Sequence, residues 1–98
     1  MGMNVGILTI KLRLPENMSL KGKRQVVKSV VAQLQNRFKV SAAEVADNDL
    51  WQVATVGGAF ISNDSRFTNE VLSKAQSFVF NGNFDAELLD YNIEIIPL

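Results

Sequence analysis

The chain has 98 residues with no cysteine and no histidine, and its ten basic and ten acidic side chains cancel. The missing residue types exclude disulfides, thiolate chemistry and the usual zinc sites, and they remove the commonest general base. The chain is therefore expected not to be an enzyme and to use no cofactor and no metal. Its length indicates a single domain over residues 1–98, with residues 1–3 as a loose N-terminus.

Residues 4–14 predict a half-buried strand, because apolar and polar side chains alternate along them. The face expected under the helices holds Leu8, Ile10, Leu12 and Leu14. Ser19 suits a helix N-cap, and residues 20–38 repeat apolar side chains at helical spacing. Residues 40–47 then predict a second, alanine-rich strand, followed by turn residues.

Residues 50–62 predict a third strand that places Leu50, Val56 and Phe60 under the helices and Trp51, Val53 and Thr55 on the other face. The pair Gly57-Gly58 suggests a bulge or a close backbone approach. A second helix is expected between the N-capping residues Asn63-Asp64-Ser65 and the stop at Asn81-Gly82. A final strand alternates from Leu89 to Ile95, and Pro97 ends it.

This β-α-β-β-α-β order predicts an α+β fold of the ferredoxin-like kind, a four-stranded antiparallel sheet with both helices on one face. The other face is expected to be open. We predict that it pairs in a homodimer or larger homo-oligomer, with the interface residues Val5, Ile7, Trp51 and Val53. Trp51 on that face could instead stack on a nucleic-acid base, although the oligomer interface is the favoured interpretation.

The charges divide the chain. Residues 1–40 hold eight basic residues and one acid, and residues 41–98 hold two basic residues and nine acids. The basic residues around the start of the first helix form the predicted RNA- or anion-binding cluster, which consists of Lys11, Arg13, Lys21, Lys23, Arg24 and Lys28. Two alternatives stay open, namely that the two halves interleave and neutralise each other, or that the cluster is only a solvated face.

The sequence gives little support for a metal site or a membrane segment. The segment Asp47-Asn48-Asp49 fails the calcium-loop pattern and is typical of a hairpin turn. No apolar run approaches the roughly 18 residues of a membrane span, and the opening residues do not form a signal peptide. The expected location is the cytoplasm, without membrane contact.

Several segments together resemble the small bacterial YlxP-like family, over nearly the whole chain from Val5 to about Ile95. They are Leu12-Arg13-Leu14-Pro15, Ser19-Leu20-Lys21-Gly22-Lys23-Arg24, Asn36-Arg37-Phe38-Lys39-Val40, Ala43-Glu44-Val45, Asp49-Leu50-Trp51-Gln52 and Ser62-Asn63-Asp64. The resemblance implies a ferredoxin-like fold without an established activity, and gene neighbourhoods that hold translation and ribosome-maturation factors. Two positions depart from the pattern: Gly22 replaces an expected acid, and Val53 replaces an expected arginine.

Two functions follow as hypotheses. The leading one is a non-enzymatic protein that binds RNA or a ribosomal particle through the basic start of the first helix. The alternative is a small homo-oligomeric scaffold, or a module for a small anion or another ligand, without a role in nucleic-acid binding.

Overall fold

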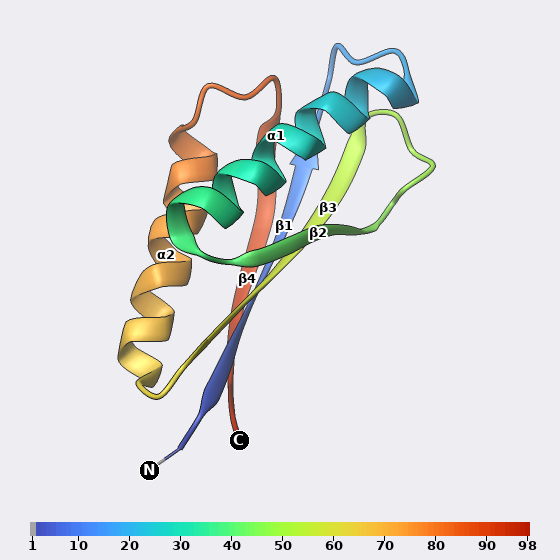
Figure 1. Cartoon of the computed structure of the whole chain (residues 1–98). Coiled ribbons are helices and arrows are strands. Elements are labelled where there is room, and N and C mark those ends of the chain that lie inside the picture. The colour runs from blue at the N-terminus through green and yellow to red at the C-terminus, as the bar shows by residue number, and fades with distance from the viewer. Residues whose placement is uncertain (1) are drawn as a thin grey trace.

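The computed structural model describes residues 2–98, so Met1 of the predicted loose N-terminus lies outside the described residues. Within this range the backbone carbonyl of Met3 accepts a hydrogen bond from the Leu98 N–H at 2.8 Å. The elements, shown in Figure 1, are β1 (Asn4–Arg13), α1 (Leu20–Phe38), β2 (Ser41–Ala46), β3 (Val53–Ser62), α2 (Ser65–Asn81) and β4 (Glu87–Pro97). The predicted element order is confirmed.

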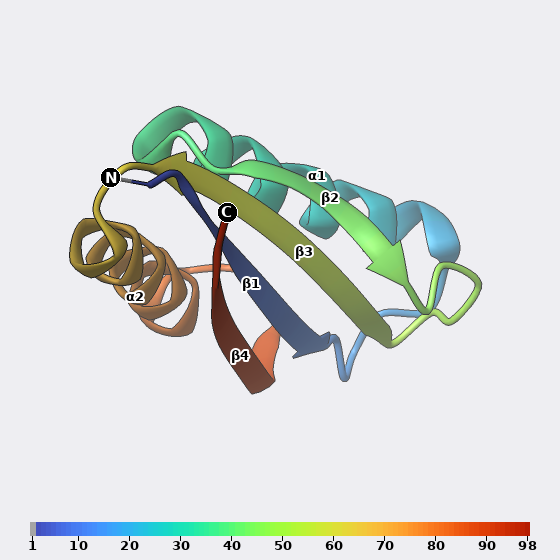
Figure 2. The same cartoon turned by 90° about the horizontal axis from the view of Figure 1, so that it is seen from below.

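The four strands form one antiparallel sheet in the order β2-β3-β1-β4. Helix α1 packs on β2 and β3, and α2 packs on β1 and β4. Both helices lie on the same face of the sheet in Figure 1, and Figure 2 shows the four strands side by side from below. We call the face of the sheet turned away from the helices the open face. The predicted ferredoxin-like α+β architecture is thus confirmed.

The core lies between the helices and the sheet. Leu8, Ile10, Leu12 and Leu14 are fully buried, as their alternation predicted. The helices contribute spaced apolar residues to the same core, and these residues are Val27, Val30, Leu34, Leu72, Ala75 and Val79. Burying such side chains is the main stabilising contribution to a domain of this size. It also fixes which side chains of β1 face outward.

Of the two alternatives predicted for Gly57-Gly58, the structure shows the close approach and not the bulge, because β1 and β3 pair without interruption through both glycines. The groups that approach the two glycines are side chains of the β2 region. A Cβ atom on Gly58 would lie 2.6 Å from Val40, and one on Gly57 would lie 3.0 Å from Val45. The irregular pairing of this hairpin lies in β2, between Glu44 and Ala46.

Strand β3 begins at Val53 rather than at residue 50. Leu50 and Trp51 therefore belong to the loop between β2 and β3, and each is 51% exposed. Two predictions are corrected by this: Leu50 does not lie under the helices, and Trp51 does not lie on the open face. The turn residues before them explain the difference, because the Leu50 N–H bonds to the Asp47 carbonyl and holds the chain out of the sheet.

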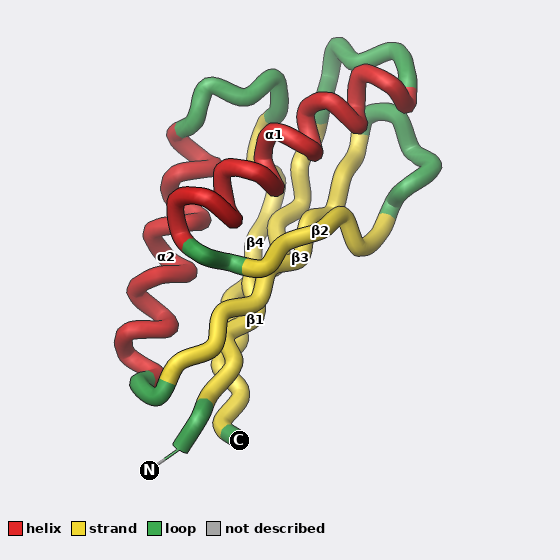
Figure 3. Tube along the Cα trace, in the orientation of Figure 1, coloured by secondary structure: helices red, strands yellow, loops and turns green. Residues whose placement is uncertain are grey.

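Three loops gather at one end of the sheet, as Figure 3 shows. They are residues 14–19 after β1, residues 47–52 between β2 and β3, and residues 82–86 before β4. The start of α1 lies at this end too, where the Ser19 side chain accepts a hydrogen bond from the Gly22 N–H at 3.0 Å. The predicted N-cap is confirmed, and this end collects the candidate site residues.

Candidate functional site

Lys21, Arg24 and Lys28 form one exposed row on α1, which we call the basic stripe. Their spacing of three and four residues places them on the same side of the helix, over about 10 Å of its axis. Within residues 2–98, none of the three makes an ion pair. The structure therefore keeps this part of the predicted cluster together and leaves its charge uncompensated.

Lys23 does not belong to that surface. Its side chain is buried, and its Nζ lies 2.5 Å from the Asp47 carbonyl, 3.0 Å from the Val53 carbonyl and 2.9 Å from Glu44 Oε2. Two of the three N–H groups of this ammonium thus donate to backbone carbonyls, and its charge lies beside the Glu44 carboxylate. The prediction that Lys23 binds an external anion is corrected, because an RNA phosphate cannot reach this group.

The Lys23 contacts give the residue a structural role. Asp47 and Val53 stand at the two ends of the β2–β3 loop, so one amine holds both ends. The Glu44 oxygen is close enough for an ion pair but has no well-aligned hydrogen bond, and its side chain is 15% exposed. Removing one partner of such a buried pair costs about 3–5 kcal/mol, because the other polar groups stay unpaired.

Lys11 and Arg13 lie apart from the basic stripe. They alternate with the buried Leu12 and Leu14, so they point to the open face, whereas α1 packs on the other face. Strand β4 places acids opposite them, Asp90 beside Lys11 and Glu87 beside Arg13. Lys11 Nζ also lies 3.8 Å from Asp47 Oδ2. In the sheet, therefore, residues of the basic half and of the acidic half of the chain interleave, and Lys11 makes an ion pair with an acid of the other half.

The predicted interface residues also separate. Val5 and Ile7 lie on the open face at one end, next to Ile61 and Ala59 of β3. Val53 pairs with Arg13 at the other end, about 26 Å along the strands from Val5. Trp51 lies in the β2–β3 loop outside the sheet. The four residues therefore do not form one patch, and only Val5 and Ile7 are neighbours.

Trp51 instead joins the end of the molecule where α1 begins. The side-chain amide of Asn17 donates hydrogen bonds to the Trp51 carbonyl at 2.5 Å and to the Ser19 carbonyl at 2.6 Å. The Gln52 side chain donates to the carbonyls of Pro15 and Asn17 at 3.2 and 3.1 Å. The Leu14 N–H bonds to the Gln52 carbonyl at 2.8 Å. The loops 14–19 and 47–52 are thus fixed side by side.

Gly22 is part of the same arrangement. A Cβ atom at this position would collide with the Asn17 side-chain oxygen. The departure from the family pattern at Gly22 therefore has a steric reason here, since a larger residue would displace Asn17 from the carbonyls of Ser19 and Trp51. Sequence reasoning missed Asn17 and Gln52. Their only signals are the turn residues around Pro15 and the segment Asp49-Leu50-Trp51-Gln52.

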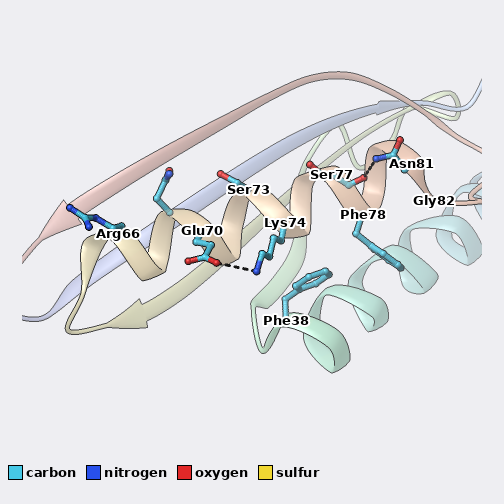
Figure 4. A pocket seen from close by; sticks show the side chains of 10 residues that line it. Phe38, Arg66, Glu70, Ser73, Lys74, Ser77, Phe78, Asn81 and Gly82 are labelled. Carbon is cyan, nitrogen blue, oxygen red and sulfur yellow. Dashed lines mark hydrogen bonds and ion pairs between the residues drawn. The ribbon is translucent and has the colours of Figure 1, made fainter.

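One hollow lies elsewhere, along the outer side of α2. It is a groove of about 690 Å³ that reaches from Arg66 to Gly82, and Phe38 of α1 borders it (Figure 4). An ion pair of 3.0 Å between Glu70 and Lys74 lies within it. No predicted site residue lines this groove.

A second hollow, of about 580 Å³, borders the start of α1 on the side that faces the loop 82–86 and the start of β4. Its acidic lining residues are Glu16, Asp85 and Glu87, and no basic residue lines it. The end of the molecule where α1 begins therefore carries acids on one flank and the basic stripe on the other.

Among residues 2–98, no three acids approach one another closely enough to hold a metal ion. No helix in this range is long and apolar enough to cross a membrane.

Comparison with known proteins shows the family of this chain. The profile of the family described as "Protein of unknown function (DUF503)" matches residues 5–93. The "Uncharacterized protein YlxP" of Bacillus subtilis (strain 168) is 36% identical over 61 residues, which make up 62% of this chain and 66% of that protein. The match thus spans just under two thirds of the relative's length. Both descriptions leave the function open, so the function has to be argued from the site.

Proposed function

We propose a function for this chain, which belongs to the DUF503 family of proteins of unknown function. The protein binds RNA through the basic stripe, and it is cytoplasmic and not an enzyme. The YlxP-like resemblance implies gene neighbourhoods with translation and ribosome-maturation factors, so the expected RNA is ribosomal RNA or another RNA of the translation machinery. Lys21, Arg24 and Lys28 contact the phosphates, and the buried Lys23 does not.

The observation that carries the proposal is the uncompensated charge of the stripe. Lys11 and Arg13 face acids of β4, Lys23 is buried, and Lys74 pairs with Glu70 at 3.0 Å. The stripe has no such partner within the part of the chain that the structure describes. Exposed cations aligned over about 10 Å suit a phosphate backbone, which carries regularly spaced anions.

The position of the stripe also argues against a purely stabilising role. Lys21 and Arg24 lie near the N-terminus of α1, where the helix dipole is positive and where the first turn contains no acid. Each exposed cation at such a position costs roughly 0.3–1 kcal/mol. The same positive end attracts a phosphate. The arrangement therefore favours binding of an anion over stability of the helix.

The test is the salt dependence of RNA binding, measured by fluorescence anisotropy with a labelled single strand of about 12 nucleotides. Three phosphate contacts predict a slope of log affinity against log salt of about −2. The triple variant Lys21→Gln, Arg24→Gln, Lys28→Gln should lose nearly all of this slope. The matched control removes three exposed positive charges elsewhere, with Lys39→Gln, Arg66→Gln and Lys74→Gln, and should keep it. Equal slopes for the two triple variants would contradict the proposal, as would the absence of RNA binding at low salt.

Free phosphate distinguishes an RNA interface from a small-anion site. An RNA interface should lose affinity when the strand is shortened, because phosphate contacts are lost with it. Competition by millimolar phosphate beyond its ionic-strength effect, with no dependence on strand length, would assign the stripe to a small anion.

A second candidate function, the homo-oligomeric scaffold, is favoured by one observation on the open face. Val5 of β1 pairs with Ile61 of β3 and with Ile96 of β4, so three β-branched side chains form a row across three strands. Ile61 is 58% exposed. Such a row is typical of a surface that another protein covers. Light scattering should then give a mass above 10.8 kDa, and Ile61→Lys should give the monomer mass. A monomeric wild-type protein at micromolar concentration would exclude this function.

A further inference from the structure

The end of the molecule beside the basic stripe carries three exposed apolar side chains on two loops. Met18 is 73% exposed, and Leu50 and Trp51 are each 51% exposed. We call these three residues the loop tip. They lie outside the helices and the strands, so no element of the sheet accounts for them. An exposed tryptophan in this position offers a large apolar surface that a binding partner can cover.

Side chains of two neighbouring residues, Lys23 and Asn17, fix the backbone of the loop that carries Leu50 and Trp51. Lys23 binds the carbonyls at both ends of the β2–β3 loop, at 2.5 and 3.0 Å. The Asn17 side chain binds the Trp51 carbonyl itself. A loop fixed in this way loses little conformational freedom when it binds a ligand, which preserves more of the contact energy as affinity. Lys23 and Asn17 are thus positioning residues for Trp51.

The loop tip and the basic stripe are neighbours. The Asn17 amide that binds the Trp51 carbonyl also binds the carbonyl of Ser19, the N-cap of α1. Lys21, the first residue of the stripe, follows Ser19 by two positions. A ligand that contacts both surfaces must therefore offer an apolar face and negative charge within a short distance.

We infer that the RNA bound by this protein is single-stranded and that Trp51 stacks on one of its bases; the inference rests on the proposed function. A single strand presents both the faces of its bases and its phosphates, whereas a duplex hides the faces of its bases. Two acids, Glu16 and Asp49, flank the loop tip and repel phosphates there. The phosphates then run along the basic stripe, and an uncharged base covers the tip.

Trp51 is the only tryptophan of the chain, so its fluorescence reports on the loop tip directly. Titration with a single-stranded RNA of about 12 nucleotides should quench this fluorescence, with the same midpoint as the anisotropy of the labelled strand. The same RNA annealed to its complement should quench little and bind more weakly. Trp51→Leu keeps an apolar side chain without an aromatic face and should weaken binding of the single strand by about 5- to 150-fold, with an unchanged salt slope. Trp51→Phe should recover part of the loss.

The outcomes separate this inference from the proposed function. RNA binding that depends on the basic stripe but leaves Trp51 fluorescence and Trp51→Leu affinity unchanged would overturn the inference alone. Binding of the duplex as tightly as the single strand would do the same. A wild-type dimer that Trp51→Leu converts to a monomer would reassign the loop tip to a second copy of this chain. Absence of any RNA binding would overturn the proposed function and this inference with it.

Discussion

Two kinds of basic residue lie next to each other on α1, and they differ in what surrounds them. Lys21, Arg24 and Lys28 lie on the outer side of the helix and have no ion-pair partner among residues 2–98. Lys23 is buried and binds two loop carbonyls and a carboxylate. The charge of a segment therefore does not assign a role to its residues. Their position relative to the core does.

The helical register explains the division. Lys23 is spaced from Val27, Val30 and Leu34 by four, seven and eleven residues, so it follows the buried row of α1. The residues of the basic stripe fall outside that row. Substitutions at the two kinds of residue should therefore have different effects. A substitution at Lys23 should lower the stability of the fold, and substitutions in the basic stripe should weaken RNA binding.

The largest expected effect on stability is at Lys23. Lys23→Met should lower the free energy of unfolding by about 3–5 kcal/mol, because Glu44 and the carbonyls of Asp47 and Val53 lose their partner. Urea denaturation followed by Trp51 fluorescence measures the change. The matched control Lys28→Met introduces the same side chain at an exposed position and should change the stability by less than about 0.5 kcal/mol. Equal stability of the two variants would show that Lys23 is not a structural residue.

A smaller effect is expected at Asn17, which connects the loop tip to the start of α1. Asn17→Ala removes two hydrogen bonds to backbone carbonyls and should cost about 1–2 kcal/mol in urea denaturation. It should also increase amide hydrogen exchange in the loop 47–52, since that loop is then held less firmly. Unchanged exchange in this loop would show that Asn17 does not fix it.

Gly22 provides a second test of the same contact, because the effect of one substitution there should depend on Asn17. Alanine is favoured over glycine in a helix by about 1 kcal/mol. In the Asn17→Ala background, Gly22→Ala should therefore stabilise the protein by about that amount. In the wild-type protein it should give no such gain, because the new Cβ collides with the Asn17 side chain. Equal effects in both backgrounds would mean that the two residues are not coupled.

The smallest expected effect concerns an acid beside the loop tip. Asp49→Asn removes a negative charge near the bound strand and should tighten RNA binding about two-fold at low salt, as expected for an exposed charge. The effect should vanish at high salt. The control Glu94→Gln lies on β4 opposite Ile7, away from the loops, and should leave the affinity unchanged.

Most of the fold could be predicted from the sequence. The alternation in β1 and the helical spacing over residues 20–38 mark the side chains that the core buries, and these patterns are visible in the sequence alone. It was not sufficient for residues 50–52. Alternation continued across them, but the turn that begins at Asp47 and the contacts with Asn17 keep them out of the sheet. Those contacts join residues more than 30 positions apart, which periodicity cannot detect.

The site was predictable in part. The shared face of Lys21, Arg24 and Lys28 followed from their spacing. The burial of Lys23 was predictable in principle, because its place in the apolar row was visible, but grouping the residues by charge hid it. The separation of Lys11 and Arg13 from the stripe required knowing that their strand presents them to the open face, opposite the acids of β4.

The most direct test of the different roles on α1 is chemical labelling of lysines in the wild-type protein, with and without single-stranded RNA, read by mass spectrometry. We predict that Lys23 stays unlabelled in both states, that Lys21 and Lys28 react freely and become protected by RNA, and that Lys74 on α2 reacts equally in both. Protection should disappear as salt is raised, together with binding. Labelling of Lys23 at the rate of a surface lysine, or unchanged labelling of Lys21 and Lys28 when RNA is bound, would contradict the account.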